Sequence, residues 1–484
     1  MANDNESALG LRGAPQALSR PGGAAGAQLS RVLGPVQFFA LSFGCIVGSG
    51  WVVVLGSWLQ ACGPLGVVIG MLLGGSVMLA NSGAYAELIA RYPRAGGEFV
   101  FARSLFGDRT AFAVGWLWAL SLIAVAAFEA NALAWILETL VPAVQGPVLY
   151  EALHVPVSAD ALAIGLIGTA AVAWTNFRGV GSAAAMQSFL SLLFVALAVV
   201  IVLLGFAFGS IENAQPLLAA NRGNPWWIGS LWIFATTPFF LNGFQSVAQT
   251  TEERAASVTF DRIARSMAGA LLVAVAFYCL ITLAAASARP WRSLVTMPLA
   301  TAAAFDALLP HHILSTLVLV TAAISVIRVW NGTAIWAARL LMAQARAGFL
   351  PGVLGRVDQR GSPVAAIGFV ALCNAAGVLL GRGAIIPLVD MASLCLAGNL
   401  VLICIAALRL RGRAGGSALP YRTPGGATTI LYGLVGSVLT SGFILVDPIL
   451  QAHGGVPLEW IVTLVWMGFG VLFWMSWQRR ARSH

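Results

Sequence analysis

Three glycines and a serine interrupt the first long apolar segment of the sequence. The stretch SFGCIVGSGW, residues 42–51, lies inside an apolar run from about residue 34 to 58 that is long enough to cross a bilayer. Each glycine costs a helix roughly 0.5 to 1 kcal/mol against alanine, and in lipid a broken backbone must find new partners. A helix that stops and restarts exposes N–H groups at its new start. We therefore predict that the amides of Gly48, Ser49 and Gly50 bind a carboxylate, with the Ser49 hydroxyl as a further donor.

A second apolar segment is interrupted in the same manner. It reads WIFATTPFFLNGFQSVAQTTEER, residues 232–254, with Pro238 and Gly243 near its middle. Where a helix stops, its last carbonyl oxygens lack intrahelical donors, and such oxygens suit an ammonium group. The carbonyl groups that we expect to be free in the two segments belong to Gly44, Cys45, Phe234, Ala235 and Thr236. Together the two breaks offer a zwitterion a partner for each of its charges.

The composition defines the class of protein. Of the 484 residues, 59% are apolar and 9% are charged, and the mean hydropathy is +0.86. Soluble proteins carry about 25% charged residues, so the sequence predicts an all-α integral membrane protein with many spans.

Twelve apolar segments can be laid out along the chain, and the two interrupted ones are the first and the sixth. This placement predicts an inverted repeat of five plus five helices, with discontinuous helices 1 and 6 and two appended helices. The predicted regions are a flexible cytoplasmic tail (1–30), a first repeat (31–209), a second repeat (210–410), and helices 11 and 12 with a cytoplasmic tail (411–484). The predicted spans lie at roughly 34–58, 62–90, 110–140, 159–176, 186–209, 227–250, 264–288, 313–345, 363–381, 384–408, 428–446 and 456–477.

Two charged side chains fall inside predicted spans. Glu129 lies in AVAAFEANALAW of span 3, and Arg328 lies in AAISVIRVWNGTA of span 8, the third members of the two halves. A charge at bilayer depth costs at least about 2.5 to 3.5 kcal/mol, so such residues usually pair or line a water-filled path. We therefore expect Glu129 and Arg328 to form a charge pair beside the broken helices. The alternative is that each residue separately pairs with backbone carbonyls or extends to the membrane surface.

The basic residues set an orientation. The chain has no lysine, and most of its 27 arginines fall on one side of the predicted spans, together with both termini. The positive-inside rule places that side in the cytoplasm, which also explains the net charge of +9 without a nucleic-acid partner. The arginines predicted on the opposite side are Arg222, Arg289, Arg292 and Arg382.

The remaining reactive side chains indicate neither catalysis nor metal binding. The six cysteines are scattered through the spans without a CxxC pair or a histidine at metal-ligand spacing, and the five histidines fall in predicted loops or at the end of the chain. The sequence therefore predicts no catalytic residue, no metal site and no cofactor. A membrane enzyme or redox carrier would need clusters of such residues, whereas a solute channel remains a rival class.

Several motifs resemble the amino acid-polyamine-organocation superfamily of permeases. GCIVGSGW resembles the glycine-serine-glycine break of its first helix, and AYAELIARYPRAGGEFVFARSLFG, residues 84–107, looks like its signature around the first cytoplasmic loop. GFQSVAQTTEE, NGTAIWAARLLMAQARAGFLP and LPYRTPGG resemble its sixth helix, its eighth helix and the loop after its tenth. The resemblance runs in order from about residue 34 to 426. It implies the inverted-repeat fold and secondary transport of amino acids or related amines across the cytoplasmic membrane of a prokaryote.

The same resemblance implies a pocket for the substrate. Phe239 stands where family members keep an aromatic gating residue, and Trp51, Asn242 and Gln245 are expected to line the side-chain pocket. Gln245 departs from the family, because many relatives carry a carboxylate there. A mechanism that relies on an acid at residue 245 is therefore in doubt for this chain.

The coupling ion is left open by the sequence. Some proton-coupled relatives keep a lysine in the fifth helix, but the family pattern puts Phe194 at that position. Glu129 could carry a proton, sodium could bind between the break and hydroxyls such as that of Ser325, or the protein could exchange solutes without an ion. We favour proton coupling.

Overall fold

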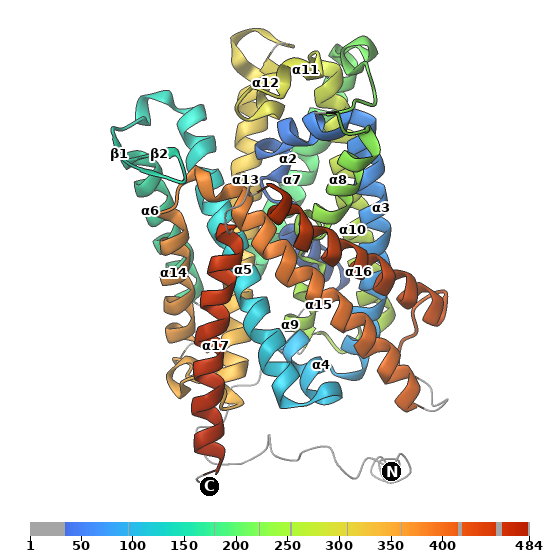
Figure 1. The fold of residues 1–484 in the computed structure, drawn as a ribbon, viewed down its shortest axis with the longest axis vertical. Helices are drawn as coiled ribbons and strands as arrows, with labels where there is room; N and C mark the ends of the chain where they lie inside the picture. The colour runs from blue at the N-terminus through green and yellow to red at the C-terminus, as the bar shows by residue number, and fades with distance from the viewer. Residues whose placement is uncertain are drawn as a thin grey trace. The chain divides into compact units, whose positions relative to one another are not determined.

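A computed structural model describes residues 34–482 apart from 95, 179, 222, 252–253, 307, 360, 415–418 and 452–456. The predicted tail 1–30 and Arg222 lie outside the described residues. The helices are α1 (Pro35–Ile46), α2 (Gly50–Val53), α3 (Leu55–Arg91), α4 (Gly97–Phe106), α5 (Asp108–Leu140), α6 (Ala159–Phe177), α7 (Val180–Phe208), α8 (Trp226–Phe240), α9 (Val247–Thr250), α10 (Phe260–Ala288), α11 (Trp291–Leu294), α12 (Ala300–Asp306), α13 (Ile313–Arg346), α14 (Val364–Val378), α15 (Ile385–Ala414), α16 (Gly426–Gln451) and α17 (Leu458–Arg482) (Figure 1).

The membrane class predicted from composition is confirmed. Ten helical segments of the described chain are long and apolar enough to cross a membrane. Helices α8 and α14 are also apolar but have 15 residues each. The one sheet among the described residues is a two-stranded antiparallel hairpin, β1 (Val148–Ala152) and β2 (Val155–Ser158), which the sequence analysis did not anticipate.

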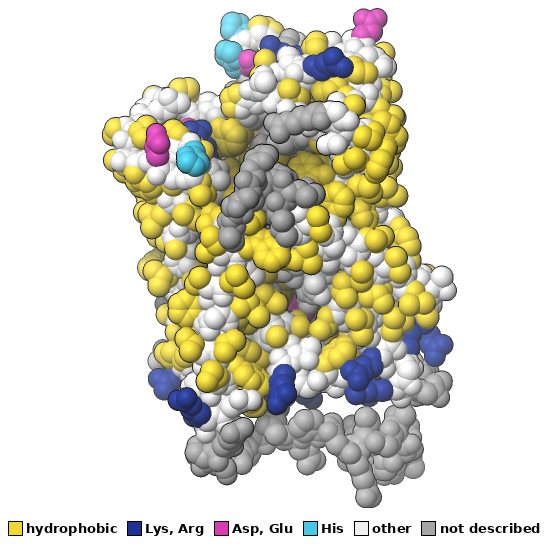
Figure 2. All heavy atoms as spheres, viewed as in Figure 1, with side chains coloured by type: hydrophobic (Ala, Val, Ile, Leu, Met, Phe, Trp, Pro, Cys, Tyr) yellow, Lys and Arg dark blue, Asp and Glu magenta, His cyan; other side chains and the backbone are white. Residues whose placement is uncertain are grey.

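The outer surface of the long helices is apolar. Large side chains that are more than half exposed occur on α6, α7, α14, α16 and α17, which is the pattern of a surface that contacts lipid rather than water. They include Ile167, Phe189, Leu203, Leu372, Leu439 and Leu464. Figure 2 shows hydrophobic side chains across the middle of one face, with most of the dark-blue basic side chains toward its lower end.

Two glycines define the ends of the first helices. Pro35 begins α1, where its fixed φ and missing N–H cost nothing, and the helix ends before Gly48. Helix α3 contains all of predicted span 2 and the end of span 1. Gly63, at φ 76° and ψ 170°, is not helical, and Pro64 follows it, so α3 consists of two helical stretches joined at a kink. The interruption predicted between residues 58 and 62 therefore lies at Gly63 and is a kink rather than a loop.

Pairs of long helices place the inner surfaces. Helices α5 and α13, which carry Glu129 and Arg328, pack along each other, α1 packs on α10, and α3 packs on α8. The interrupted α1–α2 and α8–α9 segments therefore lie among long helices whose buried faces can supply them with polar partners.

Helix α4 is fixed to its neighbours by a buried carboxyl group. Glu98 accepts hydrogen bonds from the Tyr85 hydroxyl (3.0 Å) and from Gln249 Nε2 (3.2 Å), and Gln249 Oε1 accepts from the Gly96 amide (3.0 Å). Burial raises the pKa of the Glu98 carboxyl to about 7. The network joins the loop after α3 to α9, the second half of the interrupted segment.

The contact between α3 and α8 gives a prediction about stability. A Cβ atom at Gly74 would lie 2.4 Å from Thr237 Cβ, which no change of rotamer can move. We expect Gly74→Ala to destabilise the protein by about 1 to 3 kcal/mol through overpacking. The midpoint of thermal unfolding of the purified protein in detergent measures the effect.

Gly368→Ala is the matched control, because no heavy atom lies within 4 Å of the new Cβ atom in α14. It should leave the midpoint unchanged, or raise it through a gain of up to about 1 kcal/mol in helix propensity. Equal midpoints for the two variants would show that close packing at Gly74 does not hold α3 against α8.

Candidate functional site

The two interrupted segments touch each other at their breaks. Gly243 follows α8 with φ 141°, a conformation that favours glycine, and a Cβ atom there would lie 2.4 Å from the carbonyl carbon of Cys45 and 2.6 Å from the Ile46 amide nitrogen. The backbone of one break therefore packs directly on the backbone of the other.

A small cavity lies beside this contact. Its lining residues come from α1, α5, α8, α10 and α13 and from the breaks themselves. The residues that line it are Cys45, Ile46, Gly48, Gly50, Val125, Phe128, Glu129, Phe239, Phe240, Asn242, Tyr278 and Val329. Six of them were selected from the sequence, namely Cys45, Gly48, Gly50, Glu129, Phe239 and Asn242.

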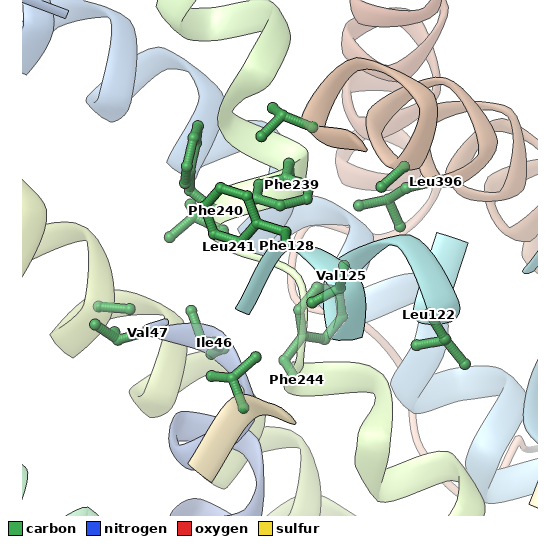
Figure 3. Packing of buried hydrophobic residues seen from close by; sticks show 14 of the residues in the cluster. Ile46, Val47, Leu122, Val125, Phe128, Phe239, Phe240, Leu241, Phe244 and Leu396 are labelled. Atoms are coloured by element: carbon green, nitrogen blue, oxygen red, sulfur yellow. The ribbon is translucent and has the colours of Figure 1, made fainter. Parts of the chain in front are cut away.

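Aromatic rings form one wall of the cavity. The Phe239 ring lies 5.2 Å from that of Phe128 and 5.0 Å from that of Phe240, measured between centroids, and both contacts are edge to face. Figure 3 shows these three side chains close together, with Ile46 and Val47 of the first break nearby. The wall suits an apolar substrate side chain, and its edge-to-face contacts are the arrangement that aromatic pairs prefer.

Glu129 occupies two of the donors that were predicted to bind a substrate carboxylate, the amide and the hydroxyl of Ser49. Its Oε2 accepts a hydrogen bond from the Ser49 hydroxyl at 2.8 Å, and the Ser49 amide lies 3.3 Å from both carboxylate oxygens. Glu129 is 2% exposed. A Cβ atom at Gly48 would lie only 1.8 Å from Glu129 Oε1, so the glycine makes this approach possible.

Arg328 binds the other end of the break. Its Nη2 donates to the Val47 carbonyl at 2.9 Å, and its Nη1 donates to the Ser191 hydroxyl at 3.3 Å. Its guanidinium carbon lies 4.4 Å from the centroid of the Phe194 ring, which fits a cation–π contact. Ser325, one turn earlier, donates to the carbonyls of Val47 (2.6 Å) and Gly48 (2.8 Å).

The expected pair of Glu129 and Arg328 is therefore not a direct contact. Among the ion pairs of the described residues, none joins these two side chains. Each satisfies a different part of the interrupted backbone, the carboxylate at an N–H group and the guanidinium at a carbonyl. The prediction placed both residues beside the break but paired them with the wrong partners.

The predicted end of the sixth segment also needs correction. Phe234, Ala235 and Thr236 lie within α8, which continues to Phe240, and the Thr236 hydroxyl bonds to carbonyls of its own helix. Pro238 has no N–H, so the Phe234 carbonyl does lack its usual donor, but the turn comes only at residues 241–243.

Four other predicted residues lie next to the cavity without lining it. Gly44 faces α7, where a Cβ atom would lie 2.5 Å from Gln187 Nε2. Trp51 is buried with its ring edge to face with that of Phe277, 5.4 Å between centroids. Gln245 Nε2 donates to Asn242, and its Oε1 accepts from the Gly243 amide, so it closes its own break. Ser49 does not line the cavity, but it donates a hydrogen bond to Glu129, which does.

Sequence reasoning missed six lining residues, Ile46, Val125, Phe128, Phe240, Tyr278 and Val329. Four of them directly neighbour a selected residue in the chain, so proximity was a usable signal for Ile46, Phe128, Phe240 and Val329. Val125, one turn before Glu129, was within reach of helical spacing. Tyr278 gave no signal beyond a hydroxyl in an apolar span.

The described residues contain no group of three or more His, Cys, Asp or Glu side chains that could hold a metal ion. All six cysteines are free. The site is therefore described by its backbone groups, its two charged side chains and its aromatic wall.

Comparison with known proteins identifies the family. Residues 33–472 match the family model described as amino acid permease. The chain is 27% identical to the branched-chain amino acid permease BcaP of Lactococcus lactis, over 84% of this chain and 88% of the relative. It is 23% identical to a methylthioribose transporter of Bacillus subtilis, over 93% of this chain and 94% of the relative. It is 25% identical to the aromatic amino acid transport protein AroP of Salmonella typhimurium, over 73% of this chain and 75% of the relative.

The chain belongs to the amino acid permease family, within the superfamily that its motifs resemble. The members named above are transporters and not enzymes. The protein is thus a multi-pass membrane transporter for amino acids or other small solutes.

The geometry of the break predicts the effect of a side chain at residue 48. We expect Gly48→Val to abolish transport in proteoliposomes, because its Cβ atom would displace the Glu129 carboxylate from Ser49. Gly50→Val should act similarly, since a Cβ atom there would lie 2.5 Å from the Phe240 ring.

The matched control is Gly442→Val in α16, where no heavy atom lies within 4 Å of the new Cβ atom. It should transport like the parent protein. Parental transport rates in Gly48→Val or Gly50→Val would remove the close approach at the break from the site.

Proposed function

We propose that the protein is a secondary active transporter that carries amino acids or related small amines across the cytoplasmic membrane by alternating access, coupled to protons. The observation that carries this proposal is the contact between two interrupted helices beside a buried cavity with a carboxylate in its wall. The names of the relatives support amino acids as substrates.

The proposal includes twelve spans. Helices α8 and α14, each of 15 residues, supply the two spans beyond the ten long ones, with α8 extended across its break by α9. The two halves, 31–209 and 210–410, would each begin with an interrupted helix, as expected of an inverted repeat. Movement of one group of helices against the other would open the cavity to each side in turn.

The substrate ammonium would bind at the end of α1. The last turn of a helix leaves carbonyl oxygens without intrahelical donors, and Cys45 and Ile46 of that turn line the cavity. The carboxamide of Asn242, on the opposite break, offers a further acceptor. Both breaks would then contribute to recognition of the amine.

Protons are favoured over sodium because Arg328 already occupies a backbone carbonyl that a sodium ion would need. The Val47 carbonyl, which a sodium ion would need together with Ser325, accepts from the Arg328 guanidinium. Arginine does not deprotonate in proteins, so this carbonyl stays occupied. Glu129 is the carboxyl group in the cavity wall that can carry a proton.

We predict that uptake depends on a proton gradient and not on sodium. Proteoliposomes with an acidic exterior should accumulate L-leucine equally well when external sodium is replaced by choline, and an uncoupler should abolish accumulation. A requirement for sodium would contradict the coupling. Uptake that needs only internal amino acid would indicate an exchanger, and dissipative flux without accumulation would indicate a channel.

A second prediction concerns the amine. Hydrogen bonds from a charged group contribute about 1.5 to 3 kcal/mol, so 4-methylpentanoate, which is leucine without its amine, should compete at least about tenfold more weakly than leucine. The measurement is inhibition of labelled leucine uptake. Equal inhibition by the two compounds would show that the carbonyl end of α1 does not recognise the substrate.

A further inference from the structure

We infer that Glu129 occupies the position of the substrate carboxylate and that a substrate with a carboxylate binds only when Glu129 takes up one proton and releases Ser49. The inference rests on the proposed function and extends it from the presence of proton coupling to its cause. Proton uptake by Glu129 and binding of the substrate carboxylate would be linked, because the first frees the two Ser49 donors that the second uses.

The two donors cannot serve two carboxylates at once. Ser49 offers one N–H and one O–H, and Glu129 uses both. The carboxylate also fills the space against the backbone, since a single added carbon at Gly48 would overlap Oε1. Two carboxylates that share the same donors in a buried site do not both remain ionised. One carboxylate must leave or become neutral.

Besides Ser49, no described group that faces Glu129 makes a hydrogen bond or an ion pair with it. The groups that face it are Arg328 from α13, Tyr278 from α10 and Cys45 from α1, besides Ser49 itself. Arg328 is held by Val47 and Ser191 and makes no ion pair with Glu129. Tyr278 and Cys45 line the same cavity and carry no positive charge. An ionised carboxylate without partners is costly to bury, so departure of Glu129 from Ser49 requires a proton.

The proton balance of the cycle follows. A proton from the external water forms an O–H bond on the Glu129 carboxylate as the substrate carboxylate takes the Ser49 donors. The same O–H bond breaks on the cytoplasmic side when the substrate leaves and Glu129 returns to Ser49. A net-neutral amino acid would therefore enter with one proton and one positive charge. An amine without a carboxylate does not compete for Ser49 and would bind without proton uptake.

The test compares two ligands that differ only in the carboxylate, L-leucine and isoamylamine. Titration calorimetry of the purified full chain, in pairs of buffers with different ionisation enthalpies, counts the protons taken up on binding. We expect about one proton per leucine at a pH where Glu129 is ionised and none per isoamylamine. This comparison in the parent protein depends on no variant.

Glu129→Gln identifies the proton site. Because the amide cannot ionise, the variant should bind leucine with no proton uptake and with an affinity that does not change with pH. Glu98→Gln is the matched control, since Glu98 is also buried and its pKa of about 7 makes it the rival proton carrier. It should keep the parental proton count.

Three results would overturn the inference. The first is that leucine binds to the parent protein and no proton is taken up anywhere in the range from about pH 6 to pH 9. The second is an unchanged proton count in Glu129→Gln. The third is binding of isoamylamine but not of leucine. A proton count that disappears in Glu98→Gln alone would also overturn it, by moving the proton site to the α4 network. If neither leucine nor isoamylamine binds and neither is transported, the proposed function fails, which is a different outcome from a wrong proton count.

Discussion

An interrupted backbone in the membrane must have its hydrogen-bonding groups satisfied, and the rest of this structure is organised around that requirement. Where α1 stops, the Val47 and Gly48 carbonyls accept from Ser325 and Arg328 of α13. Where the chain restarts, the Ser49 amide donates to Glu129 of α5. Lipid offers no substitute for these partners, and each unsatisfied group would cost several kcal/mol. The two buried charges thus have a structural role before they have any role in transport.

That dependence explains why the charges lie apart. A carboxylate is matched to N–H donors and a guanidinium to carbonyl acceptors, so the polarity of the broken backbone separates Glu129 from Arg328 and positions each on its own helix. The Phe194 ring lies against the guanidinium of Arg328, which is fully buried. Helices α5 and α13 are consequently joined through the break as well as by their direct packing.

The cavity has a polar surface, formed by backbone groups at the breaks, and an apolar surface, formed by aromatic side chains. Backbone groups at the breaks bind charge without adding side-chain volume, while Phe128, Phe239 and Phe240 supply an apolar wall. Such a division suits a family whose members are named for branched-chain and aromatic amino acids. Discrimination among these substrates would come from the aromatic wall, and recognition of the shared charged groups from the breaks.

The sequence by itself determined the membrane class, the existence of two breaks and the two charged residues beside the first break, because apolar run length, glycine and proline placement and isolated charges act locally. It also predicted Gly48, Gly50, Phe239 and Asn242 at the cavity, where helix interruption decides the position. Only the tertiary structure decided which donor meets which acceptor. Glu129 lies 80 residues from Ser49 in the chain. No local pattern shows that the Glu129 carboxylate binds Ser49 rather than Arg328. Contacts across such separations depend on the packing of whole helices, which a one-dimensional pattern does not contain.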